Sequence, residues 1–444
     1  MTVENDPFYG SRRAAARAFA MPTAVTAVST WLVVAAVFAL PPLGVLAHKA
    51  LAPLALLTAL AALPLLHATR WRAPRSMRIL ALPAIAALAW CWASALWSID
   101  PGLALARAAK LTGITVIGAI LFAAIVDLPE PRRCQVGAAL VFGVAAALLL
   151  ITIDLALGGG LRQALRDVPS YYGMASLNNG TTLVVLLVGP AIVWLWRFGA
   201  APGRAIWRWL APVPVAVCVY LLMNLESQSA AAAFAAGAVT FVVVAAAPKI
   251  IARLMAVGVA VVIMAAPSLV LAVFDARVGL DDKVMRRLPE WFDGLSSTTI
   301  HRLYIWDFSV ERILERPLLG WGLDSSRVMP GRDVMITEVN SDLPPTIYGQ
   351  MQVLPLHPHN APLQIWLELG LPGAVLFALI SGGLLYGVAG RTGNRLGAGV
   401  AAAVLVMALA LSSMSYGIWQ TWWLAALWFA AALTAVTVRR PANK

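Results

Sequence analysis

Two histidines and an asparagine stand where a polar part of the sequence meets a long apolar one. The stretch Leu356–Gly373 reads LHPHNAPLQIWLELGLPG and places His357, His359 and Asn360 directly before the apolar run. Asn is a favourable helix N-cap, and Pro362 is tolerated in a first helical turn. His359 is therefore predicted at the N-terminal end of a membrane helix. The positive end of the helix dipole favours a neutral imidazole there, which can accept a proton.

An acidic side chain lies on the same predicted helix. Asn360, Gln364 and Glu368 recur every four residues, so they share one helix face. At about 1.5 Å per residue, Glu368 lies roughly 12 Å below the cap. A carboxylate at that depth in a membrane is costly and marks a functional or buried polar site. These residues alone leave two interpretations open: a proton-accepting site, or a helix cap above a satisfied buried acid.

The composition sets the class of protein. Of the 444 residues, 61% are hydrophobic and only 12% are charged, which predicts a polytopic membrane protein. Cys91, Cys134 and Cys218 fall in apolar runs or a cytoplasmic turn, so no disulfide framework is implied. The first twenty residues lack a short apolar core with a cleavage site and are interpreted as a cytoplasmic tail before a retained helix.

Twelve apolar spans are predicted, each long enough to cross about 30 Å of hydrocarbon. Their approximate ranges are 21–46, 50–69, 79–98, 106–127, 135–157, 175–196, 208–224, 227–247, 252–274, 361–390, 396–415 and 418–438. Twelve spans place both chain ends on one side, and the positive-inside rule makes that side the cytoplasm. The short connections on the opposite side then hold only Lys49, Arg107, Lys110, Arg162 and Arg166 as basic residues. This distribution explains most of the net charge of +12 and excludes a nucleic-acid partner.

The spans divide the chain into three parts. Residues 1–274 are predicted to form transmembrane helices 1–9 with short loops, and residues 361–444 helices 10–12 and a cytoplasmic tail. Residues 275–360 form one long non-cytoplasmic loop, far longer than a connection needs. Residues 300–316 of this loop have apolar positions at helical spacing, with Asp307 on another face, and predict an amphipathic helix. The fold class is thus an all-α polytopic membrane protein of about twelve transmembrane helices with one large loop.

Several cations on the loop side are candidates for binding an anion. Arg302 opens the predicted loop helix, and a guanidinium binds phosphate oxygens in a bidentate way. Arg162 and Arg166 lie four residues apart and would share a helix face, and Lys110 with Arg107 is a weaker candidate. For each of them, a solvated or interfacial side chain is the alternative. The loop holds more acidic than basic residues, so any anion site in it must be built from particular side chains.

No motif for a nucleotide or metal cofactor stands out. The chain has no Walker loop, no glycine-rich dinucleotide fingerprint and no Cys/His metal spacing. The adjacent acids Asp281 and Asp282 are a weak metal motif, with a solvated loop as the alternative. No cofactor and no metal are therefore expected, and a reaction on the loop side needs a donor that arrives already activated. A polyprenyl diphosphate-linked sugar fits, because its diphosphate is a leaving group that arginines bind.

Two stretches of the sequence resemble a known family. The first is His359-Asn360-(x)2-Leu363-(x)4-Glu368-(x)-Gly370-(x)2-Gly373, and the second is Arg302-(x)3-Trp306 followed by Pro317-Leu318-Leu319-Gly320-(x)-Gly322. Together with the spans and the long loop, they resemble the O-antigen ligase and polymerase superfamily of bacterial inner membranes, most closely the O-antigen ligase of lipopolysaccharide assembly. Family members commonly carry a Ser-Arg pair at the outer start of the eighth span. This chain has Ser227-Gln228-Ser229 there, so another cation would substitute.

The resemblance implies a reaction and a place for it. An O-antigen glycan would pass from undecaprenyl diphosphate to the lipid A-core oligosaccharide, on the periplasmic side of the inner membrane, without metal or ATP and with inversion. His359 would be the general base and Arg302 would neutralise the diphosphate. His357 and Asn360 would orient the base or bind sugar. Further substrate-binding residues are expected among the following: Arg162, Arg166, Lys110, Gln228 and Glu368.

Three other functions stay open. O-antigen polymerases usually have two sizeable periplasmic loops, and O-linked protein oligosaccharyltransferases usually carry further C-terminal periplasmic sequence. This chain has one long loop and reaches Lys444 just after its last span, which favours the ligase. A lipid-linked glycan transporter would not need a histidine cluster at the end of a helix.

Overall fold

The computed structural model describes residues 23–69, 75–161, 164, 170–225, 227–274, 297–335, 351–389 and 394–438. The helices of these residues, in chain order, are α2 (Thr23–Ala47), α3 (Leu51–Thr69), α4 (Arg75–Ala93), α5 (Pro101–Val126), α6 (Glu130–Ala156), α8 (Ser170–Phe198), α9 (Ile206–Leu210), α10 (Val213–Asn224), α11 (Gln228–Ala246), α12 (Pro248–Phe274), α14 (Ser297–Glu315), α16 (Ala361–Leu384), α17 (Arg395–Met414) and α18 (Thr421–Val438). Short 3-10 turns and one π-helical turn, η6 (Leu385–Ala389), complete them.

The predicted fold class is confirmed. Ten helical stretches of the described residues are long and apolar enough to cross a membrane. One of them, 24–66, contains both α2 and α3, which pack against each other because the chain turns at η2 (His48–Ala50). A shorter apolar stretch, Leu80–Leu96, includes most of α4. Each of the twelve expected spans therefore coincides with helix, and the protein is an all-α polytopic membrane protein.

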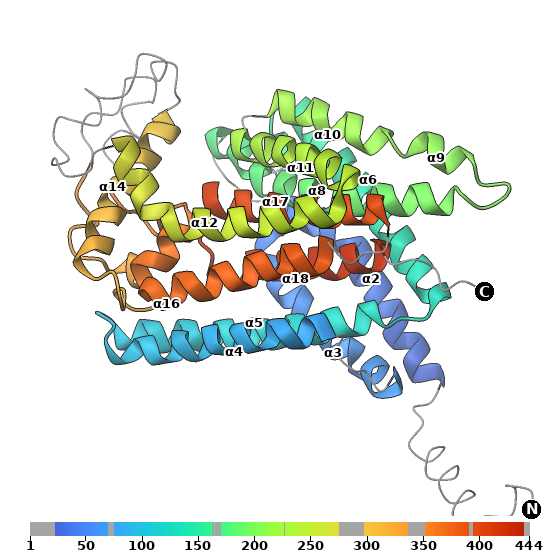
Figure 1. Cartoon of the computed structure of the whole chain (residues 1–444). Coiled ribbons are helices and arrows are strands. Elements are labelled where there is room, and N and C mark those ends of the chain that lie inside the picture. Colours follow the sequence, from blue (N-terminus) through green and yellow to red (C-terminus); the bar gives the residue numbers. More distant parts are fainter. Residues whose placement is uncertain are drawn as a thin grey trace, which may run out of the picture.

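The long helices form one bundle, and α14 lies at one end of it. The closest packed pairs include α11 with α17, α2 with α6, α12 with α16, and α18 with α5. In Figure 1 α14 and the chain that follows it gather at one end, whereas α2 begins and α18 ends toward the other. Two parts of the expected loop, 275–296 and 336–350, lie outside the described residues, and they include Asp281 and Asp282.

A separate apolar core fixes α14 to the bundle. α14 runs from Ser297 to Glu315, close to the predicted 300–316. Its buried residues Leu303, Val310 and Ile313 pack with the ends of α12 and α16 and with the 353–354 segment. Asp307 was predicted on a polar face, but the structure buries it to 4% exposure, and the prediction for this residue is wrong. The loop helix is therefore part of the packed protein and can hold side chains in fixed positions.

α16 is interrupted, and the interruption was not predicted. At Gly370 the backbone leaves the helix, with φ 62° and ψ −159°. The segment 317–322 docks at this break: the backbone N–H of Trp321 donates to the Leu367 carbonyl, and that of Gly322 to the Glu368 carbonyl, both over 2.9 Å. These bonds satisfy carbonyl groups that the broken helix cannot use. The two family-like stretches of the sequence thus meet directly in the structure.

Glycine is required on both sides of this contact. Gly320 and Gly370 both have positive φ, which side-chain-bearing residues rarely adopt. A Cβ at Gly320 would lie 2.6 Å from the Glu368 carbonyl carbon, and one at Gly370 would lie 2.7 Å from the Gly320 nitrogen. Two backbones approach here so closely that no side chain fits between them.

We expect Gly370→Ala to lower the melting temperature of the detergent-purified protein sharply. The added Cβ meets main-chain atoms that cannot move aside, and the left-handed backbone alone adds about 1–2 kcal/mol. Gly258→Ala on α12 is the matched control, since nothing lies within 4 Å of its Cβ, and its melting should be unchanged or slightly higher. Equal melting of the two variants would contradict the close backbone contact.

Candidate active site

His359 adopts a strained backbone conformation. Its φ is 51°, and within the described part of the chain the one other non-glycine residue with positive φ is Asp324, at 61°. Such a conformation costs about 1–2 kcal/mol, so surrounding contacts must hold it in place. Strain of this kind collects at functional sites. Both strained residues belong to the same cluster of side chains.

The α17–α18 connection, residues 415–420, fixes the ring of His359. The Nδ1 atom lies 2.9 Å from the carbonyl oxygen of Ser415. A carbonyl oxygen only accepts hydrogen bonds, so Nδ1 carries the proton and donates it. In the neutral ring Nε2 then holds the free lone pair, and no described residue forms a hydrogen bond to it. The ring is held in the tautomer whose Nε2 can accept a proton.

His357 lies against His359 and fixes its main chain. The two ring centroids are 4.1 Å apart. The backbone N–H of His359 donates to His357 Nδ1 over 3.2 Å. His357 is 5% exposed, and a Cβ at Gly417 would come within 2.8 Å of its Cδ2. The ring is thus enclosed between the His359 main chain and the α17–α18 connection, which suits a positioning role.

α14 brings the predicted arginine to the same place. The Trp306 indole N–H donates to the Pro358 carbonyl over 3.1 Å, and His301 Nε2 donates to the Gln352 carbonyl over 2.8 Å. These bonds hold α14 across the segment that contains the two histidines. Arg302 is half-buried beside His301. The positive charge of Arg302 is one of the causes that lower the pKa of His359, so the guanidinium lies within electrostatic reach of that ring.

Burial and positive charge keep both histidines neutral. Burial lowers the pKa of His359 to about 4, with Arg302 and His301 acting in the same direction and the hydrogen bond to the main chain opposing them. Burial lowers the pKa of His357 to about 2, and the charges of His359 and Arg327 add to the effect. At neutral pH both imidazoles are therefore uncharged, as expected for His359 from its place at the end of a helix.

The first turns of α16 follow the predicted pattern. Asn360 is the N-cap, and its Oδ1 accepts from the Leu363 backbone N–H over 3.2 Å. Gln364 Oε1 accepts from the backbone N–H of Ile418 over 3.1 Å, and its Nε2 donates to Glu368 over 3.0 Å. The polar face of α16 therefore faces the α17–α18 connection.

Glu368 is completely buried and accepts four hydrogen bonds. Its Oε1 accepts from Ser326 Oγ at 2.6 Å and from Gln364 at 3.0 Å. Its Oε2 accepts from the backbone N–H of Asp324 at 2.5 Å and from the Trp419 indole at 2.6 Å. Two hydrogen bonds to each oxygen suit an ionised carboxylate. Its exposed fraction is 0%, so its contacts favour a positioning role over direct substrate binding.

Asp324 extends this cluster to α5. Its carboxylate pairs with Arg107 at 2.7 Å and with Arg327 at 3.1 Å. Arg107 also donates to the carbonyl of Trp419 over 3.2 Å, so it is engaged within the protein. The Arg327 side chain is 33% exposed, and its charge acts on His357. Arg327 is thus a second cation at the site, beside Arg302.

The first turn of α11 also reaches the site. Ser415 Oγ donates to Ser229 Oγ over 2.7 Å, which places α11 next to the residue that holds the His359 ring. Gln228 is exposed in this turn. Ser227, the N-cap residue, is 2% exposed, makes no capping hydrogen bond, and its Oγ has no partner among the described residues.

Of the predicted cations Lys110, Arg162 and Arg166, the structure describes Lys110 alone. Lys110 is exposed on α5, one helical turn beyond Arg107, and its role stays a prediction. Arg162 and Arg166 lie outside the described residues. In the described part of the chain, no group of three or more His, Cys, Asp or Glu residues is placed to hold a metal ion.

Sequence reasoning missed several residues of the site. The carbonyl of Ser415 and the indole of Trp419 come from the connection SYGIWQ, whose aromatic and amide residues between two apolar spans were the available signal. Ser326 and Arg327 follow the PLLGWG stretch by a few residues. Spacing along the chain gave no reason to join them to His359, because the contacts span distant segments.

Comparisons with known proteins cover the segment that contains this site. Residues 213–378 match the family described as O-antigen ligase, a range that includes the start of α11, α14, both histidines and Glu368. The chain is thus similar to the O-antigen ligase superfamily over this range. Two relatives provisionally named polysaccharide ligase come from Rickettsia conorii, 28% identical over 76% of this chain and 74% of its own, and from Rickettsia felis, 27% identical over 76% and 75%.

The names of the two relatives describe ligases of polysaccharides. The apolar helices make the protein described here an integral membrane protein. The matched range ends at 378, so the α17–α18 connection lies beyond it. The part of the chain that holds the His359 tautomer is thus outside the segment by which the family is identified.

We expect Glu368→Gln to destabilise the protein. A glutamine has one acceptor oxygen, so its NH₂ would face two donors that now bond to the carboxylate, and each lost hydrogen bond to a charged group is worth about 1.5–3 kcal/mol. Thermal unfolding in detergent measures the effect. Glu315→Gln is the matched control, because its 2.6 Å pair with Arg312 is exposed and should contribute little. Unchanged melting of Glu368→Gln would refute the anchoring role.

Proposed function

We propose that the protein transfers an O-antigen glycan from undecaprenyl diphosphate to the lipid A-core oligosaccharide. The observation that carries the proposal is the hydrogen bond from His359 Nδ1 to the Ser415 carbonyl. It leaves Nε2 as a proton acceptor beside the half-buried cation Arg302. A base next to a cation, at the membrane boundary of a polysaccharide ligase relative, suits glycosyl transfer from a lipid-linked diphosphate.

The base acts on the acceptor hydroxyl. Nε2 of His359 takes its proton, and the oxygen attacks the anomeric carbon while the bond from that carbon to the diphosphate oxygen breaks. The leaving diphosphate keeps the electron pair, and direct displacement inverts the anomeric centre. Such general-base catalysis typically contributes about 10²–10⁴-fold. His357 and Asn360 keep the ring and its helix cap in place through their hydrogen bonds to residues 359 and 363.

The leaving diphosphate is stabilised by local groups. Arg302 and Arg327 are the cations whose charges act on the two histidines. The first turn of α11 presents a helix N-terminus, whose positive dipole end favours an anion. Its N-cap side chain, Ser227, makes no capping hydrogen bond. In this proposal these groups bind the diphosphate in place of the arginine expected near Gln228. Lys110, Arg162 and Arg166 remain further candidates for the same role.

The site faces the periplasm in this proposal. The charge distribution of the sequence supports a cytoplasmic location for both chain ends. The start of α2 and the end of α18 lie toward the end of the bundle opposite α14 (Figure 1). A periplasmic site at an inner membrane has access to the lipid-linked donor and to lipid A-core, and the donor's diphosphate supplies the driving force without a nucleotide.

The direct test is a reconstituted reaction. Purified protein is incubated with undecaprenyl diphosphate-linked glycan and lipid A-core, in excess EDTA and without nucleotide, and joined product is measured per unit of folded protein. We expect product from the parent and none from His359→Ala, because that change removes the base. His357→Ala should retain partial activity, since this ring positions the base.

Other outcomes separate the rival functions. Lengthening of the glycan in the absence of the core acceptor would identify a polymerase. Transfer of the glycan to an added protein acceptor would identify an oligosaccharyltransferase. Loss of product in EDTA with recovery on adding a divalent ion would overturn the arginine mechanism. An active His359→Ala with an inactive His357→Ala would reverse the assignment of the base.

The rate of transfer should depend weakly on pH near neutrality. A base must be unprotonated, and the pKa of His359 is lowered by burial to about 4, so the rate should be flat at neutral pH and fall as the pH drops through about 4. An ordinary histidine would lose activity near 6.5. The lowered pKa values of both histidines also make the unfolded state bind more protons below 6.5, so stability falls with falling pH. Melting must therefore be followed at each pH.

Arg302→Lys should impair transfer strongly although it keeps the charge. Lysine lacks the planar fork that binds two phosphate oxygens at once. Arg316→Lys is the control, because Arg316 is exposed just after α14 and lies 4.0 Å over the Trp321 ring, a contact that a lysine can keep in part. Rates of both variants are compared at equal amounts of folded protein. Parental activity in Arg302→Lys would move the diphosphate site to other cations.

A further inference from the structure

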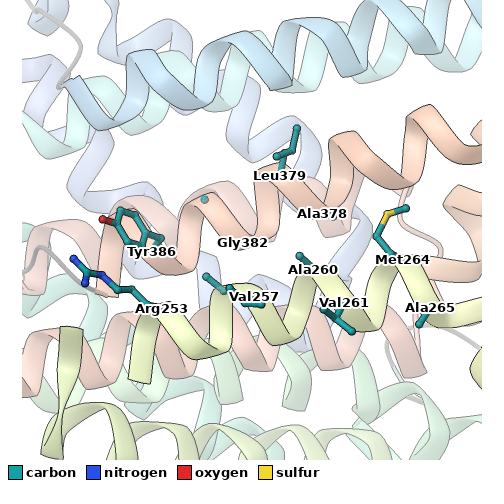
Figure 2. A pocket seen from close by; sticks show the side chains of 12 residues that line it. Arg253, Val257, Ala260, Val261, Met264, Ala265, Ala378, Leu379, Gly382 and Tyr386 are labelled. Carbon is teal, nitrogen blue, oxygen red and sulfur yellow. The ribbon is translucent and has the colours of Figure 1, made fainter. Parts of the chain in front are cut away.

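A groove runs along the lipid-facing side of the bundle between α12 and the second half of α16. Its volume is about 860 Å³. Figure 2 shows side chains from both helices along it, with Arg253 and Tyr386 at one end and Met264 toward the other. Its lining includes Ala256, Val257 and Leu379. The groove is separate from the candidate active site at the start of α16.

Small residues create the groove where the two helices would otherwise fill the space. Gly382 brings α16 so close to α12 that a Cβ there would lie 3.0 Å from the Ala256 carbonyl oxygen. Ala260 and Ala378 add no more than methyl groups to the lining. The π-helical turn η6 follows directly, and it carries Tyr386 to the end of the groove. The floor is thus apolar along most of its length.

One end of the groove carries a cation that pairs with no carboxylate in the described part of the chain. Arg253 is the one charged residue of the lining, and its guanidinium lies 5.7 Å from the Tyr386 ring centroid. α12, η6 and α17 contain no acidic residue, and the acid of α16, Glu368, lies in its first half. Lys249 lies one helical turn before Arg253. This end of the groove therefore suits an anionic group at a membrane surface.

The other end of the groove lies beside Met264 and Ala265 on α12. There the Trp366 indole N–H donates to the Ile263 carbonyl over 2.9 Å and joins the first half of α16 to α12. Both residues are buried, at 9% and 3% exposure. In the lining, Arg253 is on the opposite end from this contact (Figure 2).

We propose that this groove binds one anionic glycerophospholipid. An acyl chain lies along Val257, Val261 and Leu379, and the phosphate is held by Arg253 beside the Tyr386 ring. The apolar length with one cation at its end matches the chemistry of such a lipid, and the volume falls within the range of about 300–1,000 Å³ found for ligand sites. The proposal is independent of the transfer reaction, and its test measures lipid binding.

The test uses the full-length protein, freed of lipid in detergent and titrated with phosphatidylglycerol or phosphatidylcholine. Native mass spectrometry counts retained lipids, and melting reports stabilisation. We expect one phosphatidylglycerol to bind in preference to phosphatidylcholine. Arg253→Gln should weaken its binding about fivefold, the effect of one basic residue at a lipid surface, whereas Lys249→Gln, outside the lining, should weaken it less.

A second pair of variants tests the apolar part. Ala260→Phe fills the groove and should remove the bound lipid, whereas Val262→Phe, exposed on α12 and outside the lining, should keep it. Equal lipid retention by Arg253→Gln and the parent would overturn the headgroup assignment. If undecaprenyl phosphate displaces phosphatidylglycerol at equal concentration, the occupant is a polyprenyl lipid and the assignment to a phospholipid is wrong. If soluble glycerol phosphate competes with phosphatidylglycerol, the site binds phosphate without an acyl chain, and the proposal that it binds a whole phospholipid is wrong.

Discussion

The structure around the candidate site depends on one buried carboxylate. Glu368 accepts hydrogen bonds from Ser326 and the Asp324 backbone, from Trp419, and from Gln364 on its own helix. These donors belong to three segments that are far apart in the sequence. A buried carboxylate is stable only when such donors surround it, so the segments must meet in one arrangement. The interruption at Gly370 contributes by freeing backbone carbonyls that the 317–322 segment then satisfies.

The reactive geometry follows from that arrangement. Because Trp419 is fixed by Glu368, the connection that contains it also places the Ser415 carbonyl against His359. The same carbonyl selects the ring tautomer, and the contact with His357 fixes the main chain in its strained conformation. Glu368, which does not touch His359, therefore helps to decide which nitrogen of that ring carries the lone pair. Proton acceptors held in this way need little reorganisation when a substrate binds.

The electrostatics of the site are local. The loop region carries more acids than bases, yet the groups that lower the pKa of His359 and His357 besides burial are basic ones. They are Arg302 and His301 for His359, and His359 and Arg327 for His357. Asp324 is turned toward Arg107 and Arg327, and Glu368 is enclosed by donors, so neither carboxylate is free to pair with His359. Neutral imidazoles next to cations suit a site that takes up a proton while an anionic leaving group departs.

The sequence by itself determined the fold class, the helix that begins at Asn360 and the loop helix, because apolar length, capping residues and helical spacing are local signals. It also singled out His359, Arg302 and Glu368 by their types and positions. Only the tertiary structure decided that α16 breaks at Gly370, that Glu368 is enclosed, and that Ser415 holds the His359 ring. These features arise from contacts between segments that lie up to 56 residues apart, as Ser415 and His359 do. A periodic pattern within one helix does not predict such contacts.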